Sequence, residues 1–261
     1  MNGLVVRDVA IAFGGVVALA GIDLDLAAGE IRGVIGPNGA GKTTLLNVIC
    51  GINPPDRGDI TLGGVSLVGL KPSAIAARGL GRTFQATQLF RGMTVLENVM
   101  TGLHGHLGEG MLGAVFRSRR LRAAEARAAA RARDVLAFVG MEPFADRLAT
   151  ELSFGQQRVV EIARALISEP RVLLLDEPAV GLSLNRVAEV DALMRRIRDD
   201  RGVSILLVEH VIRLVMDVSD RITVMSYGRK IAEGSPDDIR ADPAVIEAYL
   251  GKDLHAGSPA P

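Results

Sequence analysis

A glycine-rich segment with one lysine and two hydroxyl side chains has the composition of a phosphate-binding loop. Residues Gly36 to Thr43 read GPNGAGKT, the pattern GxxxxGK[ST], and Thr44 follows them. Glycines at these positions let the backbone curl, so that successive N–H groups point at one anion. Lys42 would reach the outer phosphates as a point charge, and the Thr43 hydroxyl would hold Mg²⁺. The segment predicts binding of a nucleoside triphosphate.

Two adjacent carboxylates follow an apolar run much later in the chain. Val172–Leu175 contains only Val and Leu, Asp176 and Glu177 come next, and Pro178 follows them. An acidic side chain at the end of a buried strand is costly unless it meets a cation or has a catalytic task. Asp176 can reach Mg²⁺ directly or through water, and Glu177 can accept a proton from the water that attacks the γ-phosphate. The pair predicts hydrolysis of the bound triphosphate.

Three more side chains are of interest because of their position. Phe13 precedes a Gly-Gly turn upstream of the glycine-rich loop, where an adenine-stacking platform and a capping core side chain are equally good interpretations. His210 comes just after an apolar run and could donate a hydrogen bond to a γ-phosphate, although a lone histidine is more often structural. Gln85 ends a brief extended segment, Gly81–Gln85, and by itself indicates nothing.

The elements that position these residues follow from the apolar patterning. Glu30–Ile35 is predicted to be a strand and Thr44–Ile49 a helix, so the glycine-rich loop lies where a strand gives way to a helix. The N-terminus of that helix adds its partial positive charge to the anion site. Val172–Leu175 has the composition of a central parallel strand buried on both faces, and Val203–Val208 is predicted to be a strand. The pattern predicts an α/β core.

The middle of the chain differs in composition from both ends. From Ala86 to Thr150, helical pieces at Thr94–Gly102 and Arg117–Val139 carry Ala and Arg in place of β-branched runs. The second piece is rich in strong helix formers. We therefore predict a helical subdomain inserted into the α/β core.

A well-marked helix start follows this helical region. Residues 152–167 read LSFGQQRVVEIARALI, and Ser153 is a good N-cap before apolar residues at helical spacing. A serine hydroxyl, the amide of Gly155 and two glutamines then lie at the helix N-terminus, which indicates a second anion site. Taken alone, the segment is also explained as an ordinary well-capped helix.

Short strands and helices are predicted at both ends of the chain. The strands are Leu4–Phe13, Ile22–Leu26, Ile222–Met225 and Lys230–Glu233, the helices are Pro72–Arg78, Asn185–Asp199 and two within Pro236–Leu250, and Lys252–Pro261 is predicted to be a disordered tail.

The composition restricts the class of protein. The 261 residues are 48% apolar, and 30 basic side chains balance 30 acidic ones. Such a chain can build a large core, and it has no overall charge to attract nucleic acid or an anionic membrane. The single cysteine, Cys50, fits a reducing compartment, and no apolar run reaches the roughly 18 to 20 residues that span a bilayer. We expect a cytoplasmic protein that works at a membrane only through a partner.

In this order the segments resemble those of the ATP-binding cassette (ABC) ATPases: phosphate loop, glutamine, signature helix, strand ending in Asp-Glu, and strand ending in His. The resemblance covers about Leu4 to Gly251, and the signature helix is its specific element because other phosphate-loop enzymes lack it. Within that family the chain is similar to the ATPase subunit of bacterial branched-chain amino acid importers. The segments that carry this similarity are GRTFQ (81–85), LFRGMTVLENV (89–99), LSFGQQR (152–158), LLLDEPAVGL (173–182) and MSYGRKIAEGSPDDI (225–239).

The resemblance implies a phosphate-loop ATPase fold, with an antiparallel β subdomain and an inserted helical subdomain. Residues 1–251 would form one ABC ATPase domain, with the core and β subdomain in 1–85 and 160–251 and the helical subdomain in about 86–159. Residues 252–261 would be the tail. The commonest ABC signature has glycine where this chain has Phe154, although an aromatic residue there is similar to the importer subgroup.

The resemblance also implies a role for each residue of the site, with ATP and Mg²⁺ as the bound groups. The catalytic residues would be Lys42, Glu177 and His210, and the ligands of Mg²⁺ would be Thr43, Gln85 and Asp176. The residues around the nucleotide would be Phe13, Gly36, Pro37, Asn38, Gly39, Ala40, Gly41, Lys42, Thr43, Thr44 and Gln85. The residues that complete the ATP site of a partner subunit would be Ser153, Phe154, Gly155 and Gln156.

The partners implied are a second ABC ATPase subunit, identical or related, and two membrane-spanning permease subunits, which would hold this chain at the inner face of the cell membrane. A solute-binding protein outside the cell would take part indirectly. Other interpretations are a cassette for another solute such as urea or short amides, a lipopolysaccharide exporter, or a non-transport cassette of DNA repair or the ribosome. The neutral charge, single cassette and short helical insert argue against the last and against a nucleic-acid partner.

Overall fold

Five parallel strands and one antiparallel edge strand form the larger of two β-sheets in a computed structural model of the chain, which describes residues 3–85, 88–103 and 119–255. The strand order is β10-β9-β3-β8-β7-β6. Because the central strands are parallel, the loops that follow β3, β7 and β8 leave the sheet at one edge. The strands are β3 (Ile31–Ile35), β6 (Leu80–Arg82), β7 (Val172–Asp176), β8 (Ser204–Val208), β9 (Arg221–Ser226) and β10 (Arg229–Gly234).

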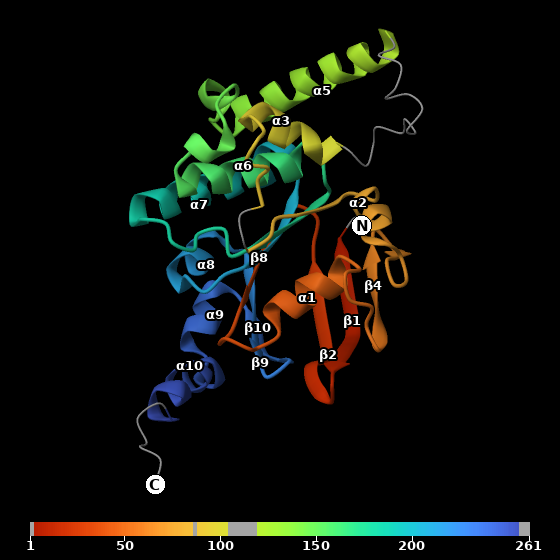
Figure 1. Ribbon diagram of the computed structural model, residues 1–261. Helices are drawn as coiled ribbons and strands as arrows, with labels where there is room; N and C mark the ends of the chain where they lie inside the picture. Colours follow the sequence, from red (N-terminus) through yellow and green to blue (C-terminus); the bar gives the residue numbers. More distant parts are fainter. Residues whose placement is uncertain (1–2, 86–87, 104–118, 256–261) are drawn as a thin grey trace.

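The second sheet is antiparallel and has the order β2-β1-β4-β5. Its first two strands form a hairpin around Gly14 and Gly15, and Figure 1 shows the sheet in red and orange beside α1. The strands are β1 (Leu4–Phe13), β2 (Val16–Leu26), β4 (Arg57–Leu62) and β5 (Val65–Ser66), and α1 is Lys42–Ile49.

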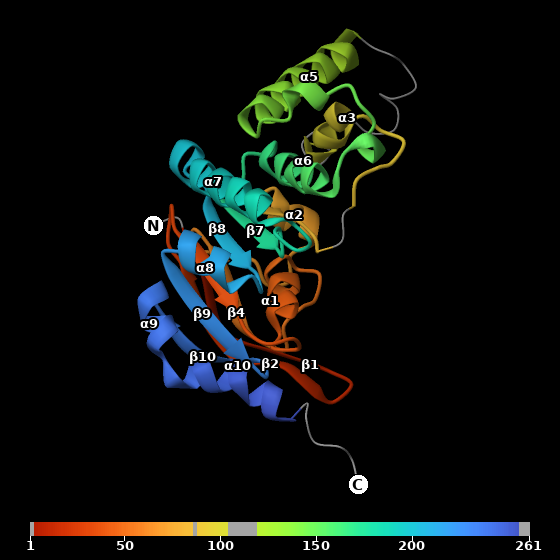
Figure 2. The ribbon, with the colours of Figure 1, turned by 90° about the vertical axis from the view of Figure 1, so that its left-hand side faces the viewer.

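Helices cover both faces of the larger sheet and extend beyond one end of it. Figure 2 shows α1 and α8 on opposite sides of the sheet, while α3, α5 and α6 lie together at the end of the molecule farthest from α10. In the described part of the chain, no helix combines the length and the apolar character needed to cross a membrane. The helices besides α1 are α2 (Pro72–Ala76), α3 (Val95–Met100), α5 (Arg119–Phe138), α6 (Phe154–Leu166), α7 (Leu184–Arg201), α8 (Ile212–Val218), α9 (Pro236–Ala241) and α10 (Pro243–His255), with short 3₁₀ turns at Thr101–Leu103, Glu142–Phe144 and Ala149–Glu151.

Alternate side chains of the larger sheet enter two separate apolar cores. Leu173 and Leu175 of β7 pack in a core with α6, α7 and α8, whereas Val172 and Leu174 pack in a core with α1 and the antiparallel sheet. This division follows from the alternation of side chains along a strand. All residues of β7 are buried, which confirms the prediction of a strand buried on both faces.

Most predicted elements are confirmed, including the mixed α/β architecture with a separate antiparallel sheet. The second strand is longer than predicted, because β2 begins at Val16 instead of Ile22 and pairs with β1 up to the Gly-Gly turn. Helix α10 continues to His255, so the predicted disordered tail does not begin at Lys252; residues 256–261 lie outside the described residues.

Helices make up most of the described part of the predicted insertion. Residues 86–87 and 104–118 of the predicted insertion lie outside the described residues. Helix α6 runs without interruption past residues 159 and 160, where a subdomain boundary was predicted, and it packs on α3 and α5 as well as on β6. The division of the chain into subdomains stays a prediction.

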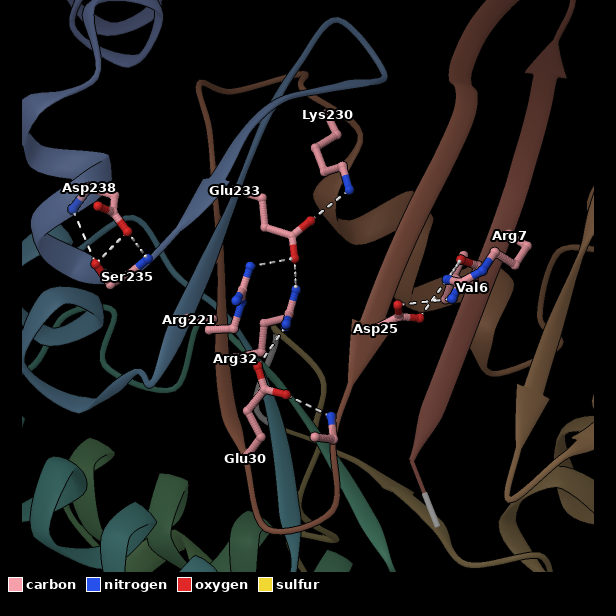
Figure 3. Close-up of polar contacts among 11 residues, drawn as sticks. Val6, Arg7, Asp25, Glu30, Arg32, Arg221, Lys230, Glu233, Ser235 and Asp238 are labelled. Carbon is pink, nitrogen blue, oxygen red and sulfur yellow. Dashed lines mark hydrogen bonds and ion pairs between the residues drawn. The ribbon is translucent and has the colours of Figure 1, made fainter. Parts of the chain in front are cut away.

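A cluster of charged side chains attaches the β9–β10 hairpin to β3 (Figure 3). Glu233 accepts hydrogen bonds from Arg32 and Lys230, each at 2.6 Å, and from Arg221 at 3.4 Å. Arg32, which is 3% exposed, also donates to Glu30 at 2.8 Å. Burial raises the pKa of Glu233, but hydrogen bonds and charge from Lys230 and Arg32 outweigh it and bring the pKa to about 2. We call these five residues the hairpin cluster.

Candidate nucleotide-binding site

The glycine-rich loop begins where β3 ends, as the sequence predicts. All residues of β3 are buried, and the loop turns back at Gly36 to enter α1 at Lys42. A Cβ on Gly36 would lie 2.1 Å from the carbonyl oxygen of Met225, and one on Gly41 would lie 2.6 Å from that of Ala18. Both glycines also have positive φ, 154° and 97°. Only glycine therefore fits at these two positions, which fixes the path of the loop.

Lys42 lies across the loop that precedes it. Its Nζ donates to the carbonyl oxygens of Gly36 at 2.7 Å and Pro37 at 3.1 Å, and the side chain is 7% exposed. Among the residues that the structure describes, no side chain caps α1 at Gly41 and no acidic residue stands in its first turn. The ammonium group and the positive end of the helix dipole are thus directed at the same loop, the arrangement that binds phosphate.

Asp176 lies at the end of β7 and has an unused oxygen. The residue is 1% exposed, and its Oδ2 accepts a hydrogen bond from Nη2 of Arg82 at 3.1 Å. Its Oδ1 is buried and has no hydrogen-bond partner within the described residues. Burial raises the pKa of Asp176, and the nearby Arg82 only partly opposes this effect. A buried carboxylate oxygen without a partner has the chemistry of a Mg²⁺ ligand, because hard cations prefer oxygen.

The described part of the chain has no cluster of three or more His, Cys, Asp or Glu side chains that could hold a metal. Mg²⁺ is usually held by one or two protein oxygens together with water and substrate phosphates. The Oδ1 of Asp176, which has no partner among the described residues, fits that ion, and the role of Thr43, in the first turn of α1, stays a prediction.

Glu177 meets Gln85 and His210, which come from two other segments. Its Oε2 accepts a hydrogen bond from Gln85 Nε2 at 2.7 Å, and its Oε1 lies 3.6 Å from Nδ1 of His210. Its backbone has φ of 51°, which is unfavourable for a residue other than glycine, and its N–H donates to the carbonyl of Val208 at 2.8 Å. The structure thus brings together three residues that the sequence predicted separately.

The start of α6 forms the predicted helix cap, and the two aromatic residues predicted for the site are exposed. Ser153 caps α6: its hydroxyl accepts from the Gln156 N–H at 3.4 Å, and Gln156 Oε1 accepts from the Ser153 N–H at 2.9 Å. The capping box confirms the predicted helix start. Phe154 and Phe13 are 45% and 47% exposed, so both rings are open to a ligand or partner. The functional roles of all the predicted site residues, Phe13, Phe154, Gly155 and Gln156 among them, stay predictions.

Buried arginines beside the site escaped the sequence analysis. Arg82 donates to Asn47 Oδ1 at 2.8 Å as well as to Asp176. Arg158 of α6 donates to the carbonyl oxygens of Phe84, at 3.0 Å, and of Gln85. Both arginines are almost fully buried, so they hold the glutamine segment and the carboxylate in place. The available signal was a charged residue within an otherwise apolar strand or helix face.

Glu161 and Glu209 were also missed. Glu161, 2% exposed, pairs with Arg158 at 3.0 Å and accepts from the N–H of Gln88 at 2.7 Å, so α6 also holds the backbone at Gln88. Glu209 is fully buried between the segments that carry Glu177 and His210. The sequence shows an acidic residue at the end of an apolar run, and nothing in it tells which amides that carboxylate meets.

Comparison with known proteins decides the family of this site. The family described as ABC transporter matches residues 19–180, which include the glycine-rich loop, Gln85, the start of α6 and the Asp176-Glu177 pair. The chain belongs to the ABC transporter family. A second family, described as branched-chain amino acid ATP-binding cassette transporter, matches residues 229–255, which include β10, α9 and α10. The predicted ABC resemblance and ATPase fold are confirmed.

Individual relatives cover the cassette almost from end to end. The chain is 42% identical to the high-affinity branched-chain amino acid transport ATP-binding protein LivG of Salmonella typhimurium over 252 residues, 97% of each chain. It is 41% identical to BraF of Pseudomonas aeruginosa, which has the same description, again over 97% of each chain. The ADP conformation of MJ1267, an ATP-binding cassette of an ABC transporter, is 31% identical, with a TM-score of 0.83 over 96% of this chain and 99% of that one.

A solved structure similar to this cassette describes an assembly of two. The dimeric post-hydrolysis state of the cassette MJ0796, bound to ADP and Pi, is 26% identical, with a TM-score of 0.74 over 89% of this chain and 98% of that one. The cassette of this chain therefore has the fold of proteins that bind nucleotide and pair with one another.

Proposed function

We propose that the chain is the ATP-binding and ATP-hydrolysing subunit of an importer for branched-chain or other hydrophobic amino acids. One observation carries the catalytic part: Glu177, hydrogen-bonded by Gln85 and facing His210, lies beside Asp176, whose Oδ1 is buried and unpartnered. The names of the relatives LivG and BraF support the choice of solute.

The loop and α1 bind the phosphates. Backbone amides between Gly36 and Thr44 surround them, and Lys42 neutralises the outer two. Thr43, Gln85 and Asp176 are the residues that would hold Mg²⁺, and the ion, when bound, would neutralise negative charge on the phosphates. Among the described residues, the Oδ1 atom of Asp176 is free to take that role.

Glu177 acts as the general base, and His210 contacts the γ-phosphate. The carboxylate Oε2 is held at 2.7 Å by Gln85, so its direction is fixed before substrate binds. A fixed base next to the reacting phosphate lowers the barrier by accepting the proton of the attacking water. His210 is half-exposed at 3.6 Å from Glu177, so a bound γ-phosphate can reach its imidazole from the open side.

A second cassette, identical or related, completes each ATP site. The start of α6 has Ser153 as its N-cap, no acidic residue in its first turn among the described residues, and an exposed Phe154, so it is suited to an anion that arrives from outside the chain. Ser153, Gly155 and Gln156 then contact ATP bound to the loop of the partner, and ATP joins the two cassettes. The dimeric MJ0796 cassette supports this arrangement.

The permease subunits dock over a groove where α2, β6 and α6 meet the helical layer. The groove has a volume of 670 Å³, and apolar groups such as Phe84, Phe90 and Met93 line it. Phe90 is 52% exposed and Met93 36% exposed, so an apolar surface there is open to a partner helix. We place the cassette on the cytoplasmic face of the membrane, held through these permeases.

Glu177→Gln tests the proposed catalytic site. The variant should bind ATP with unchanged affinity and lose about 10²- to 10⁴-fold in turnover, because glutamine cannot accept the proton. It should also accumulate an ATP-bound dimer, measurable by size-exclusion chromatography with and without ATP. Normal steady-state hydrolysis by this variant would refute the assignment, and isolation of the native complex without permeases would refute the transport role.

A further inference from the structure

A fully buried carboxylate connects the two segments that carry Glu177 and His210. Glu209 follows β8 and has no exposed surface. Its Oε1 accepts a hydrogen bond from the N–H of Ala179 at 2.7 Å, and its Oε2 accepts from the N–H groups of His210 at 2.9 Å and Val211 at 3.0 Å. One oxygen therefore binds the loop after β7, and the other binds the loop after β8.

These contacts are strong ones for a buried acid. Hydrogen bonds from backbone N–H groups to a carboxylate are charge-assisted, and such bonds are shorter and stronger than neutral ones. Ala179 is 2% exposed, so water competes little for its amide. A backbone hydrogen bond also connects the two segments, because the N–H of Glu177 donates to the carbonyl of Val208 at 2.8 Å.

The geometry points to Glu209 as a positioning residue for ATP hydrolysis: its two carboxylate oxygens fix the imidazole of His210 relative to the carboxylate of Glu177. This inference rests on the proposed roles of Glu177 and His210. Their side chains meet at 3.6 Å, yet they lie on separate loops, and Glu209 is the side chain that bonds to both loops among the described residues. Glu209 itself does not contact the reacting atoms.

Glu209→Gln keeps the shape of the side chain and removes one acceptor. The single oxygen of the glutamine side chain can accept from the Ala179 N–H or from the N–H groups of His210 and Val211, but not from both. Its NH₂ group then faces the remaining backbone N–H, and two donors that face each other cannot form a hydrogen bond. We expect kcat for ATP hydrolysis to fall by about tenfold or more, while KM for ATP stays within about threefold, because phosphate binding by the loop is untouched. A kcat equal to that of the wild type would overturn the inference.

A double-mutant cycle with His210→Ala separates positioning from a general loss of structure. If Glu209 acts through His210, the Glu209→Gln/His210→Ala double variant should be no more than about twofold slower than His210→Ala alone. Independent, multiplying losses would contradict the inference. Asp220→Asn is the matched control, because its Oδ2 accepts the Ile31 N–H at 2.7 Å at the opposite end of the same sheet. It should keep turnover within about twofold.

Amide hydrogen exchange in the wild-type chain keeps the inference testable even where the variant does not fold. The amides of Ala179, His210 and Val211 should be protected together and open in one step, because one carboxylate holds all three. Exchange of the Ala179 amide at the rate of an open loop would overturn the inference. An active Glu177→Gln variant would refute the proposed function instead, whereas an inactive Glu177→Gln beside a fully active Glu209→Gln would refute only this inference.

Discussion

Asp176 at the site and Glu233 in the hairpin cluster are both carboxylates beside a buried arginine, yet they are in opposite electrostatic situations. Glu233 receives hydrogen bonds from three cationic side chains on both of its oxygens, and its pKa falls to about 2. Asp176 receives one hydrogen bond from Arg82, keeps Oδ1 without a partner in the described residues, and has a raised pKa. A saturated carboxylate stabilises the fold, whereas an undersaturated one is available for a further cation.

Two helix starts show the same contrast. Ser153 and Ser235 both cap a helix in a capping box, but the partner is the neutral Gln156 in α6 and the charged Asp238 in α9. The carboxylate of Asp238 already occupies the positive end of the α9 dipole, and the hydrogen bonds from Ser235 lower the pKa of Asp238. The start of α6 lacks such a charge, so its dipole is available to a phosphate from outside.

The largest effect is expected when the carboxylate of Asp176 is neutralised by Asp176→Asn and compared with the same change at Glu233. The amide keeps the size of the side chain but removes the charge that attracts Mg²⁺, so we expect turnover to fall by about 10²-fold or more and half-saturation to require more Mg²⁺. Hydrolysis rates measured over a Mg²⁺ series check this. Glu233→Gln is the matched control and should keep the wild-type Mg²⁺ dependence. An unchanged Mg²⁺ concentration at half-saturation in Asp176→Asn would contradict the proposal that Asp176 holds the ion.

Local sequence patterns predicted the parts of this site that lie within one element. The strand-to-helix loop at Gly36, the buried run before Asp176 and the cap at Ser153 each depend on neighbours a few residues away. Apolar periodicity, the placement of glycines and helix-capping chemistry are enough to predict these three features. The same holds for the β9–β10 hairpin, whose two strands are confirmed.

The polar contacts that align the site could not be predicted in the same way. Arg82 and Asp176 are 94 residues apart in the chain, and Gln85 and Glu177 are 92 apart. Which of these side chains meet is decided by the pairing of β6 with β7 and by the packing of α6, which no local pattern encodes. From the sequence, His210 was therefore identified by its position after an apolar run and Gln85 only through the family resemblance, whereas Arg82 and Glu209 were missed.

A smaller effect is expected when the two caps are compared by Ser153→Ala and Ser235→Ala. Each substitution removes a hydroxyl that accepts a backbone N–H and should cost about 1 kcal/mol in the free energy of unfolding. Only Ser153→Ala should also slow ATP hydrolysis, by about tenfold, because it alone would contact the ATP of a partner. Urea denaturation and steady-state ATPase assays measure the two effects. Equal ATPase rates in both variants would contradict the role of the α6 start.

The last prediction concerns the pH dependence of the stability that the hairpin cluster contributes. The folded pKa of Glu233 is about 2, against 4.5 for a free glutamate, so the unfolded chain binds more protons between these values and stability rises with pH there. The contribution is complete above about pH 4.5 and is lost as the pH falls toward about 2. Glu233→Gln should therefore lower the free energy of unfolding at neutral pH by roughly 1 to 2 kcal/mol, after discounting for solvent and salt screening. Urea denaturation should show the gap between variant and wild type closing as the solution is acidified, and a gap that does not change with pH would show that the hairpin is held by packing instead of by charge.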